Sequence, residues 1–215
     1  MNTIQIPVTY EFGTPKTIEV ELHDRNGSLV LDLSKNEWVA GLDLNPVSDI
    51  PDLQQLIINH NMRLKDLDLS PLSTLVGLRE FVISGNKSLT SLDLSPLSEL
   101  KGLQVLSIRG NWGLTHLDLN PLTNLKGLQH LDISRNKELL SLDLNPLSSM
   151  NGLREIDLSW NLGLTSLDLN PLSNLTDLQK LHINQNSGLT DLDISPLSDL
   201  TELQVDVTGS GTCGY

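Results

Sequence analysis

The sequence predicts a solenoid, in which short structural units stack along one axis and share a continuous core. A 25-residue pattern repeats from residue 28 to about residue 202 with no insertion or deletion. Leucines recur at the same positions of every unit, and an asparagine recurs at one fixed position. A unit of this size cannot bury its own apolar side chains, so each unit must stack on its neighbours.

The segment before the first unit, residues 1–27, predicts a β-hairpin that covers the first coil. Apolar side chains alternate along residues 4–12 and again along residues 18–22, which is the period of a strand. Residues 13–16 between them have the composition of a turn. Stacked units expose backbone groups at the ends of the array, so a cap is expected there. Trp38, a little further on, is expected in the core of this cap.

Each unit is expected to begin with a strand that ends at the recurring asparagine. In the unit of residues 103–127, Leu103, Leu106 and Ile108 have the spacing L-x-x-L-x-L, whose last part alternates as a strand does. An asparagine side chain both donates and accepts hydrogen bonds, so stacked copies can satisfy the backbone groups of the turn. The equivalent asparagines are Asn36, Asn61, Asn86, Asn111, Asn136, Asn161 and Asn186.

The other two sides of each coil are predicted to be a second short strand and a helical turn. The L-x-x-L-D-L segment alternates again, and Asn120, Pro121 and Gly127 match the cap, first position and closing glycine of a short α or 3₁₀ turn. The aspartates of this segment form a second column. We expect them to accept hydrogen bonds from backbone N–H groups or from nearby hydroxyls such as that of Thr115, rather than to bind calcium.

These motifs resemble those of the leucine-rich repeat family. The pattern L-x-x-L-x-[LI]-x-x-N occurs as LQVLSIRGN at residues 103–111 and as LQHLDISRN at residues 128–136, with equivalents in the neighbouring units. The L-x-P-L-S-x-L-x-x-L portion resembles bacterial internalin-type repeats, which are shorter. The resemblance implies a curved, β-rich α/β solenoid with a parallel sheet on its concave face, used for protein recognition. No ligand residue of internalins can be carried over, because those vary from protein to protein.

The whole chain is expected to form one domain. Residues 1–27 are its N-terminal cap, residues 28–202 its seven repeats, and residues 203–215 its C-terminal cap or tail. In the 25-residue frame, Asp206 occupies a position that is apolar in the other units. Either this aspartate ends the stack, or the native array continues beyond it.

The charge balance favours basic partners. The formal net charge is −13, with 27 acidic and 14 basic side chains, so nucleic acid is not an expected partner. An alternative is that the acidity only keeps the solenoid soluble.

The single cysteine, Cys213, permits no disulfide within the chain. With no recognisable signal peptide or membrane-spanning segment, we expect a cytoplasmic monomer without a membrane partner.

Polar side chains gather on the outward face of the predicted sheet in the fourth to seventh units. Positions 3, 5 and 7 of each unit are expected to point away from the core, with equal positions about 4.8 Å apart in neighbouring units. Tryptophan and arginine, which often dominate interfaces, follow the strands at their exit. The candidate ligand-binding residues on this concave face are Arg109, His130, Asp132, Arg135, Glu155, Asp157, Trp160, Lys180 and His182.

Other interpretations of these residues stay open. Imidazoles and carboxylates at this spacing could ligate a divalent metal or transfer protons, but an open sheet face lacks the enclosed pocket typical of such sites. Arg135 could bind a partner or stack on Trp160. No nucleotide-binding, zinc-protease or serine-hydrolase motif occurs. We therefore expect no catalytic residue, no metal ligand and no cofactor.

The sequence thus predicts a non-enzymatic module that binds a protein or peptide of basic character through its concave face. One alternative is a designed, consensus-derived or structural scaffold without a ligand, because the units carry no insertions. A second alternative is a metal-binding site at the cluster of histidines and aspartates.

Overall fold

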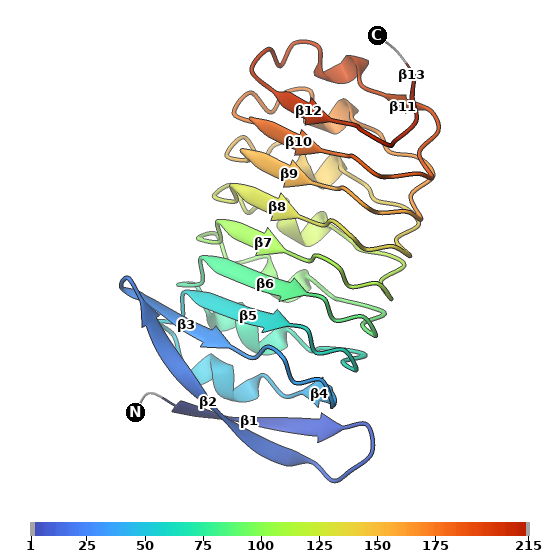
Figure 1. Cartoon of the computed structure of the whole chain (residues 1–215). Helices are drawn as coiled ribbons and strands as arrows, with labels where there is room; N and C mark the ends of the chain where they lie inside the picture. Colours follow the sequence, from blue (N-terminus) through green and yellow to red (C-terminus); the bar gives the residue numbers. More distant parts are fainter. Residues whose placement is uncertain (1–2, 214–215) are drawn as a thin grey trace.

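A computed structural model describes residues 3–213 of the protein as an elongated stack of coils (Figure 1). One strand of each coil joins an 11-stranded sheet of order β12-β10-β9-β8-β7-β6-β5-β3-β2-β1-β4. From β3 to β12 the pairing is parallel. The strands are β3 (Ser28–Asp32), β5 (Gln55–Asn59), β6 (Glu80–Ser84), β7 (Val105–Ser107), β8 (His130–Asp132), β9 (Glu155–Asp157), β10 (Lys180–His182) and β12 (Gln204–Asp206).

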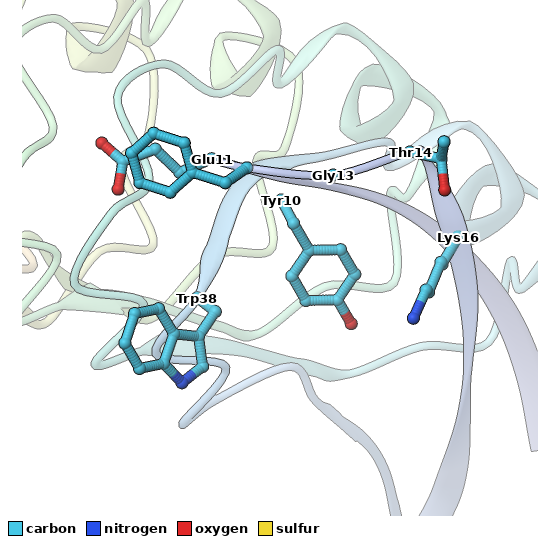
Figure 2. Close-up of a pocket in the computed structure, with 7 residues that line it drawn as sticks. Tyr10, Glu11, Gly13, Thr14, Lys16 and Trp38 are labelled. Carbon is cyan, nitrogen blue, oxygen red and sulfur yellow. The ribbon is translucent and has the colours of Figure 1, made fainter.

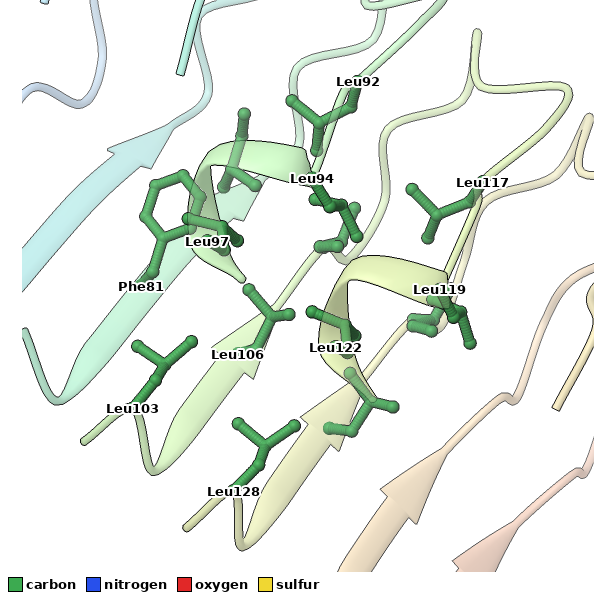
Figure 3. Close-up of a cluster of buried hydrophobic side chains, with 14 of the residues drawn as sticks. Phe81, Leu92, Leu94, Leu97, Leu103, Leu106, Leu117, Leu119, Leu122 and Leu128 are labelled. Carbon is green, nitrogen blue, oxygen red and sulfur yellow. The ribbon is translucent and has the colours of Figure 1, made fainter. Parts of the chain in front are cut away.

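The predicted leucine columns form the core. Leu106 of β7 pairs in register with Leu131 of β8, and both are buried. Figure 3 shows strand residues such as Phe81 and Leu106 facing Leu97 and Leu122 from the opposite side of the coil. Burying one leucine stabilises the fold by roughly 2 kcal/mol. Because each coil supplies several leucines to the same cluster, neighbouring coils stabilise one another.

The third side of each coil is a 3₁₀ turn with proline at its start. The turns are η1 (Asn45–Asp49), η2 (Ser70–Thr74), η3 (Ser95–Leu97), η4 (Asn120–Leu122), η5 (Asn145–Leu147), η6 (Asn170–Leu172) and η7 (Ser195–Leu197).

The prediction that Asn120 caps its turn is wrong, because η4 begins at this residue. Asp118 takes the capping role instead. Its Oδ1 accepts hydrogen bonds from the Asn120 backbone N–H at 2.9 Å and from the Asn120 side-chain amide at 2.7 Å. The aspartate column therefore has backbone partners, as predicted, but Thr115 is not among them, since its hydroxyl contacts His116.

The predicted second strand forms only at the two ends of the array, as β4 (Val39–Leu42) and β11 (Leu192–Asp193). Between these ends, within the described part of the chain, the segment forms no strand. Local turns use its N–H groups: that of Leu114 bonds to Asn111 O, and that of Asn120 bonds to Asp118. Bonds between coils are correspondingly sparse here, for example from Thr90 N to Lys65 O at 3.2 Å.

The predicted asparagine ladder is confirmed. The backbone N–H of Asn111 donates to Oδ1 of Asn136 in the next coil at 2.8 Å, and the Asn111 side-chain amide donates to Ile83 O in the preceding coil at 2.8 Å. The same backbone-to-side-chain bond joins the asparagines of successive coils from Asn36 to Asn186. Six of these residues, from Asn61 to Asn186, are buried.

The predicted N-terminal hairpin is confirmed as β1 (Thr3–Tyr10) and β2 (Lys16–Arg25). β2 pairs antiparallel with β3 while β1 pairs with β4, so the hairpin crosses the open end of the first coil. Ile6 and Val8 fill the space beneath it. The prediction that Trp38 belongs to this core is wrong, since its side chain is 61% exposed. Trp38 lies in the turn before β4, on the outside of the coil, and Val39 takes the buried place.

The last coil is one residue shorter than the others. β12 pairs with β10 in the register Lys180–Gln204 and His182–Asp206, a spacing of 24 residues. Asp206 therefore faces outward beside His182, and the prediction that it occupies a core position is wrong. Ser210 replaces the ladder asparagine. Its hydroxyl accepts from Asn186 N at 2.9 Å and donates to Ile183 O, while its own N–H donates to Val207 O.

Beyond this turn, β13 (Thr212–Cys213) pairs in parallel with β11. Within residues 3–213, no helical segment is long and apolar enough to cross a membrane.

Candidate binding surface

The solvent-facing side of the sheet carries six of the nine candidate residues. Along β8, β9 and β10 the middle residue points into the core and the flanking residues point outward. The outward pairs lie side by side because the strands are in register. They are His130 and Asp132 on β8, Glu155 and Asp157 on β9, and Lys180 and His182 on β10.

Local hydrogen bonds fix the aspartates of this face. Oδ1 of Asp132 accepts from the backbone N–H of Ser134 at 2.9 Å and from its hydroxyl at 2.6 Å. Asp157 has the same two bonds from Ser159, at 2.9 and 2.6 Å. The sequence D-x-S thus holds each carboxylate in one orientation, with its second oxygen directed away from these bonds.

The outward Asp206 extends this row to β12. Its Oδ1 accepts from the hydroxyl of Thr208 at 2.7 Å and from the Thr208 backbone N–H at 3.0 Å. These two bonds, the hydroxyl first, lower the pKa of Asp206, with a further contribution from His182. A carboxylate with a lowered pKa stays charged at a pH where an ordinary one begins to protonate.

Two ionic groupings connect the face across coils. Glu155 lies between two imidazoles, with its Oε2 3.5 Å from Nδ1 of His130 and its Oε1 3.7 Å from Nε2 of His182. Oδ2 of Asp132 lies 3.8 Å from a guanidinium nitrogen of Arg109 and accepts from the Ser107 hydroxyl at 3.3 Å. Arg109 therefore partly offsets the repulsion between the neighbouring carboxylates of Asp132 and Asp157.

The structure supplies no ligand set for the metal-site alternative. Among the described residues, no group of three or more histidine, cysteine, aspartate or glutamate side chains is arranged to hold a metal ion. The two aspartates instead direct one oxygen each to neighbouring serines, and the two histidines flank Glu155 from opposite sides.

The remaining candidates, Arg135 and Trp160, lie past the strand ends at a position with unusual backbone geometry. Their φ angles are 62° and 61°, in the left-handed region. For a residue other than glycine this conformation costs about 1–2 kcal/mol. The equivalent residues of the other coils share it: Lys35, His60, Gly85, Gly110, Gln185 and Gly209. Sequence reasoning missed this column, although Gly85 and Gly110 at equal positions were a signal for it.

The left-handed geometry brings Arg135 over the ring of Trp160, with Cζ 5.3 Å from the ring centroid. The stacking considered from the sequence therefore exists. The Trp160 side chain remains 38% exposed, so a large part of the ring is accessible to a partner.

Sequence reasoning also overlooked three aliphatic side chains on the same face. Ile57, Val82 and Val105 are outward residues of β5, β6 and β7, and each is half-buried. They lie in the same rows as the charged residues of β8 and β9. Gln55 and Glu80 are outward residues of β5 and β6 as well. The face therefore mixes aliphatic and polar side chains towards β5, whereas the outward residues of β8, β9 and β10 are all polar or charged.

Comparison with known proteins agrees with this architecture. The leucine rich repeat family model matches residues 76–137 and, in an overlapping match, residues 101–162. No curated protein sequence matches the chain.

Similar solved structures include internalin C2 from Listeria monocytogenes, with a TM-score of 0.63 and 23% identity over 86% of this chain and 73% of that one. A plant ice-binding protein has a TM-score of 0.64 and 20% identity, over 90% of this chain and 61% of that one. A chain of the LRIM1/APL1C complex has a TM-score of 0.63 and 16% identity, over 81% of this chain and 36% of that one.

These identities are low, so the solved structures establish likeness of fold and nothing more specific. Together with the strand spacing, the asparagine ladder and the family match over residues 76–162, they confirm the leucine-rich repeat architecture of the chain.

Proposed function

We propose that the protein is a non-enzymatic binding module whose open sheet face recognises a protein or peptide of basic character. Leucine-rich repeat proteins commonly bind proteins, and one structural neighbour was solved as part of the LRIM1/APL1C complex. The fold alone does not identify a surface or a partner, so the argument rests on the side chains of the face.

The fixed carboxylates of the face carry this proposal. Asp132, Asp157 and Asp206 point outward from β8, β9 and β12, and each is oriented by a neighbouring hydroxyl. Because these bonds exist before a partner arrives, little side-chain entropy is lost on binding. Carboxylates arranged in this way suit the donors of lysine and arginine side chains, and their charge speeds association with a basic partner.

Trp160 supplies apolar contact area at the border of the same surface. It follows β9 directly after Ser159, which bonds to Asp157. Partly exposed tryptophans are among the residues most often dominant at interfaces, and the left-handed backbone at this position adds a cost that a glycine would avoid. Lys35, His60, Arg135 and Gln185 carry the same cost at equivalent positions, so the exposure of the indole, and not its backbone, supports a binding role.

The proposal is tested by capturing partners from a lysate, identifying them by mass spectrometry, and measuring their affinity for variants. Asp157→Lys and Trp160→Ala are each expected to weaken binding at least about tenfold, since loss of a dominant interface residue costs about 2 kcal/mol or more. Asp177→Lys is the matched control, because it makes the same charge reversal in the same coil at an exposed residue away from the face.

Thermal unfolding of each variant shows whether the fold is retained. If the captured partner binds the Asp157→Lys and Trp160→Ala proteins as it binds the wild type, the open face is not the binding surface. If Asp177→Lys weakens binding equally, the partner is attracted by the net negative charge of the chain and not by the open face.

A further inference from the structure

A lateral edge of the solenoid differs from the rest of the molecule in both charge and aromatic content. It consists of the turns that follow the strands, on the side to which the arrows point in Figure 1. We infer that this edge is a second binding surface, suited to an acidic peptide segment that also carries apolar side chains. We call it the tryptophan edge and define it as residues 34–40, 59–65, 84–90, 109–115, 134–140, 159–165 and 184–190.

Charge is segregated onto the tryptophan edge. Although the chain has a net charge of −13, the edge contains half of its 14 lysines and arginines and only two of its 27 acidic residues, Glu37 and Glu138. The basic residues of the edge are Lys35, Arg63, Lys65, Lys87, Arg109, Arg135 and Lys137. A basic strip on an acidic protein attracts anionic groups that the remaining surface repels.

All three tryptophans of the chain also lie on this edge. Their side chains are exposed, at 61% for Trp38, 37% for Trp112 and 38% for Trp160. Each indole has a cation over its ring: Arg63 Cζ lies 4.7 Å from the centroid of Trp38, and Arg135 Cζ lies 5.3 Å from that of Trp160. Arg63 is also ion-paired with Glu11, so among the described residues exposed apolar area and uncompensated positive charge coincide at Trp112 and Trp160 rather than at Trp38.

The centre of the edge is a sandwich of Trp112 between two lysines. Nζ of Lys87 lies 4.0 Å from the ring centroid, and Nζ of Lys137 lies 4.1 Å from it. The three residues occupy the same position in successive coils, so the lysine backbones are about 10 Å apart, two sheet spacings. Within residues 3–213, neither lysine has an ion-pair partner. Both ammonium groups are therefore available to external carboxylates.

The edge ends at a pocket beneath the hairpin turn. Figure 2 shows Trp38 and Lys16 on either side of Tyr10 in this pocket, which has a volume of about 410 Å³. Nζ of Lys16 lies 5.7 Å from the Tyr10 ring centroid. Phe12 also lines the pocket, and its side chain is 87% exposed. The pocket repeats the pairing of aromatic ring and cation and can hold an apolar side chain of the bound segment.

A short acidic peptide fits this surface better than a nucleic acid does. Acidic columns flank the strip on both sides: the capping aspartates such as Asp118 lie beyond it on one side, and Asp132 and Asp157 on the sheet lie on the other. A phosphate backbone, charged at every residue, would approach these columns. An extended peptide with carboxylates near Lys87 and Lys137 and an apolar side chain near Trp112 can remain within the strip.

The position of the tryptophans makes the inference directly measurable, because all three lie on this edge and intrinsic tryptophan fluorescence therefore responds to a ligand bound there. We expect titration with a synthetic decaglutamate peptide to change the emission, and the affinity to fall steeply as salt rises, as for contacts between exposed charges. Decaglutamine of equal length serves as the uncharged probe and is expected to leave the emission unchanged.

Matched charge reversals then locate the site. Lys87→Glu with Lys137→Glu is expected to lower the affinity for decaglutamate at least tenfold. Lys101→Glu with Lys126→Glu changes the net charge equally, but both residues lie on another side of their coils, and affinity should change less than threefold. Trp112→Phe keeps an aromatic ring in the sandwich and tests the indole itself, with affinity expected to fall only a few-fold.

Three results would overturn the inference: emission that does not respond to decaglutamate, equal weakening by the two double variants, or tighter binding of a ten-nucleotide oligothymidylate than of decaglutamate. Circular dichroism of each variant shows whether the coils are intact. If the double reversal at Lys87 and Lys137 unfolds the chain, the neutral pair Lys87→Gln and Lys137→Gln replaces it, with the same expected direction.

Discussion

Asn111 and Asp118 lie in the same coil and recur in the same way through the array, yet their surroundings differ completely. Asn111 is buried, and its bonds reach the coils on either side. Asp118 is exposed, and its bonds end within its own coil at Asn120. A polar residue that recurs at a fixed spacing therefore has either of two roles, and burial decides which one. The buried column joins coils, whereas the exposed column shapes each coil separately.

The largest expected effect comes from Asn111→Ala. The change leaves Asn86 N–H and Ile83 C=O without partners in a buried place, and each such group costs about 1–3 kcal/mol. We expect the free energy of unfolding to fall by about 3 kcal/mol, measured by urea denaturation. Asn120→Ala is the matched control, since it removes the same amide from an exposed site of the same coil, and it should cost less than about 1 kcal/mol. If both variants lose the same free energy of unfolding, the buried and exposed columns do not differ in their contribution to stability.

The next smaller effect is the difference between two double-mutant cycles, one within the asparagine column and one within the aspartate column. In a double-mutant cycle, Asn111→Ala and Asn136→Ala should couple by about 1 kcal/mol, because the Asn136 side chain bonds to the backbone N–H of Asn111 and to Ile108 O in the turn that Asn111 ends. Asp118→Ala and Asp143→Ala should add within about 0.5 kcal/mol, because each aspartate bonds only within its own coil. Coupling of equal size in both cycles would show that the aspartates also join neighbouring coils.

The smallest effect concerns pH. The pKa of Asp93 is lowered, first by the Ser95 hydroxyl and then by the Ser95 backbone N–H, against smaller opposing effects of desolvation and of Asp68. A lowered folded-state pKa gives stability that is present above the unfolded pKa and is lost as pH falls through the folded pKa. We expect Ser95→Ala to raise the pKa of Asp93, measured by NMR titration.

Ser91→Ala is the control for that titration, because no hydrogen bond joins Ser91 to Asp93 in the described part of the chain.

The asparagine ladder contains no titratable group, so the loss of unfolding free energy caused by Asn111→Ala should be the same at pH 4 and pH 7. A pH-dependent cost would mean that acidic groups outside the ladder contribute to its stability.

The fold was largely predictable because one repeat period determines every column. The strands, the asparagine ladder, the hairpin and the leucine core all follow from the alternation of apolar residues and from one recurring asparagine. The second strand was not predictable from the L-D-L pattern, because alternation shows which side chains are buried and not which N–H groups find partners in the next coil. Local turns at Leu114 and Asn120 take those groups.

The surface was less predictable for reasons that concern the backbone. Asp206 was misplaced because the last coil is one residue shorter than the others, and the sequence does not show where. Leu203 still lies 25 residues after its equivalent in the preceding coil, but the strand that follows it lies only 24 residues after its equivalent. Trp38 was misplaced because an aromatic residue near a cap suggests burial, whereas the structure places it on the outside of a turn. The left-handed column was signalled only by glycines, since arginine and tryptophan at the same position give no sign of their φ angle.

The short last coil has a practical consequence for changing the length of the array. Elsewhere, the backbone N–H at the ladder position donates to the neighbouring coil, but in the last coil the N–H of Ser210 turns back to Val207 O. A unit fused after this coil would find its expected hydrogen-bond donor already used. A duplicated unit inserted between residues 127 and 128 would instead meet compatible partners above and below. Engineering of longer versions therefore belongs in the interior of the array.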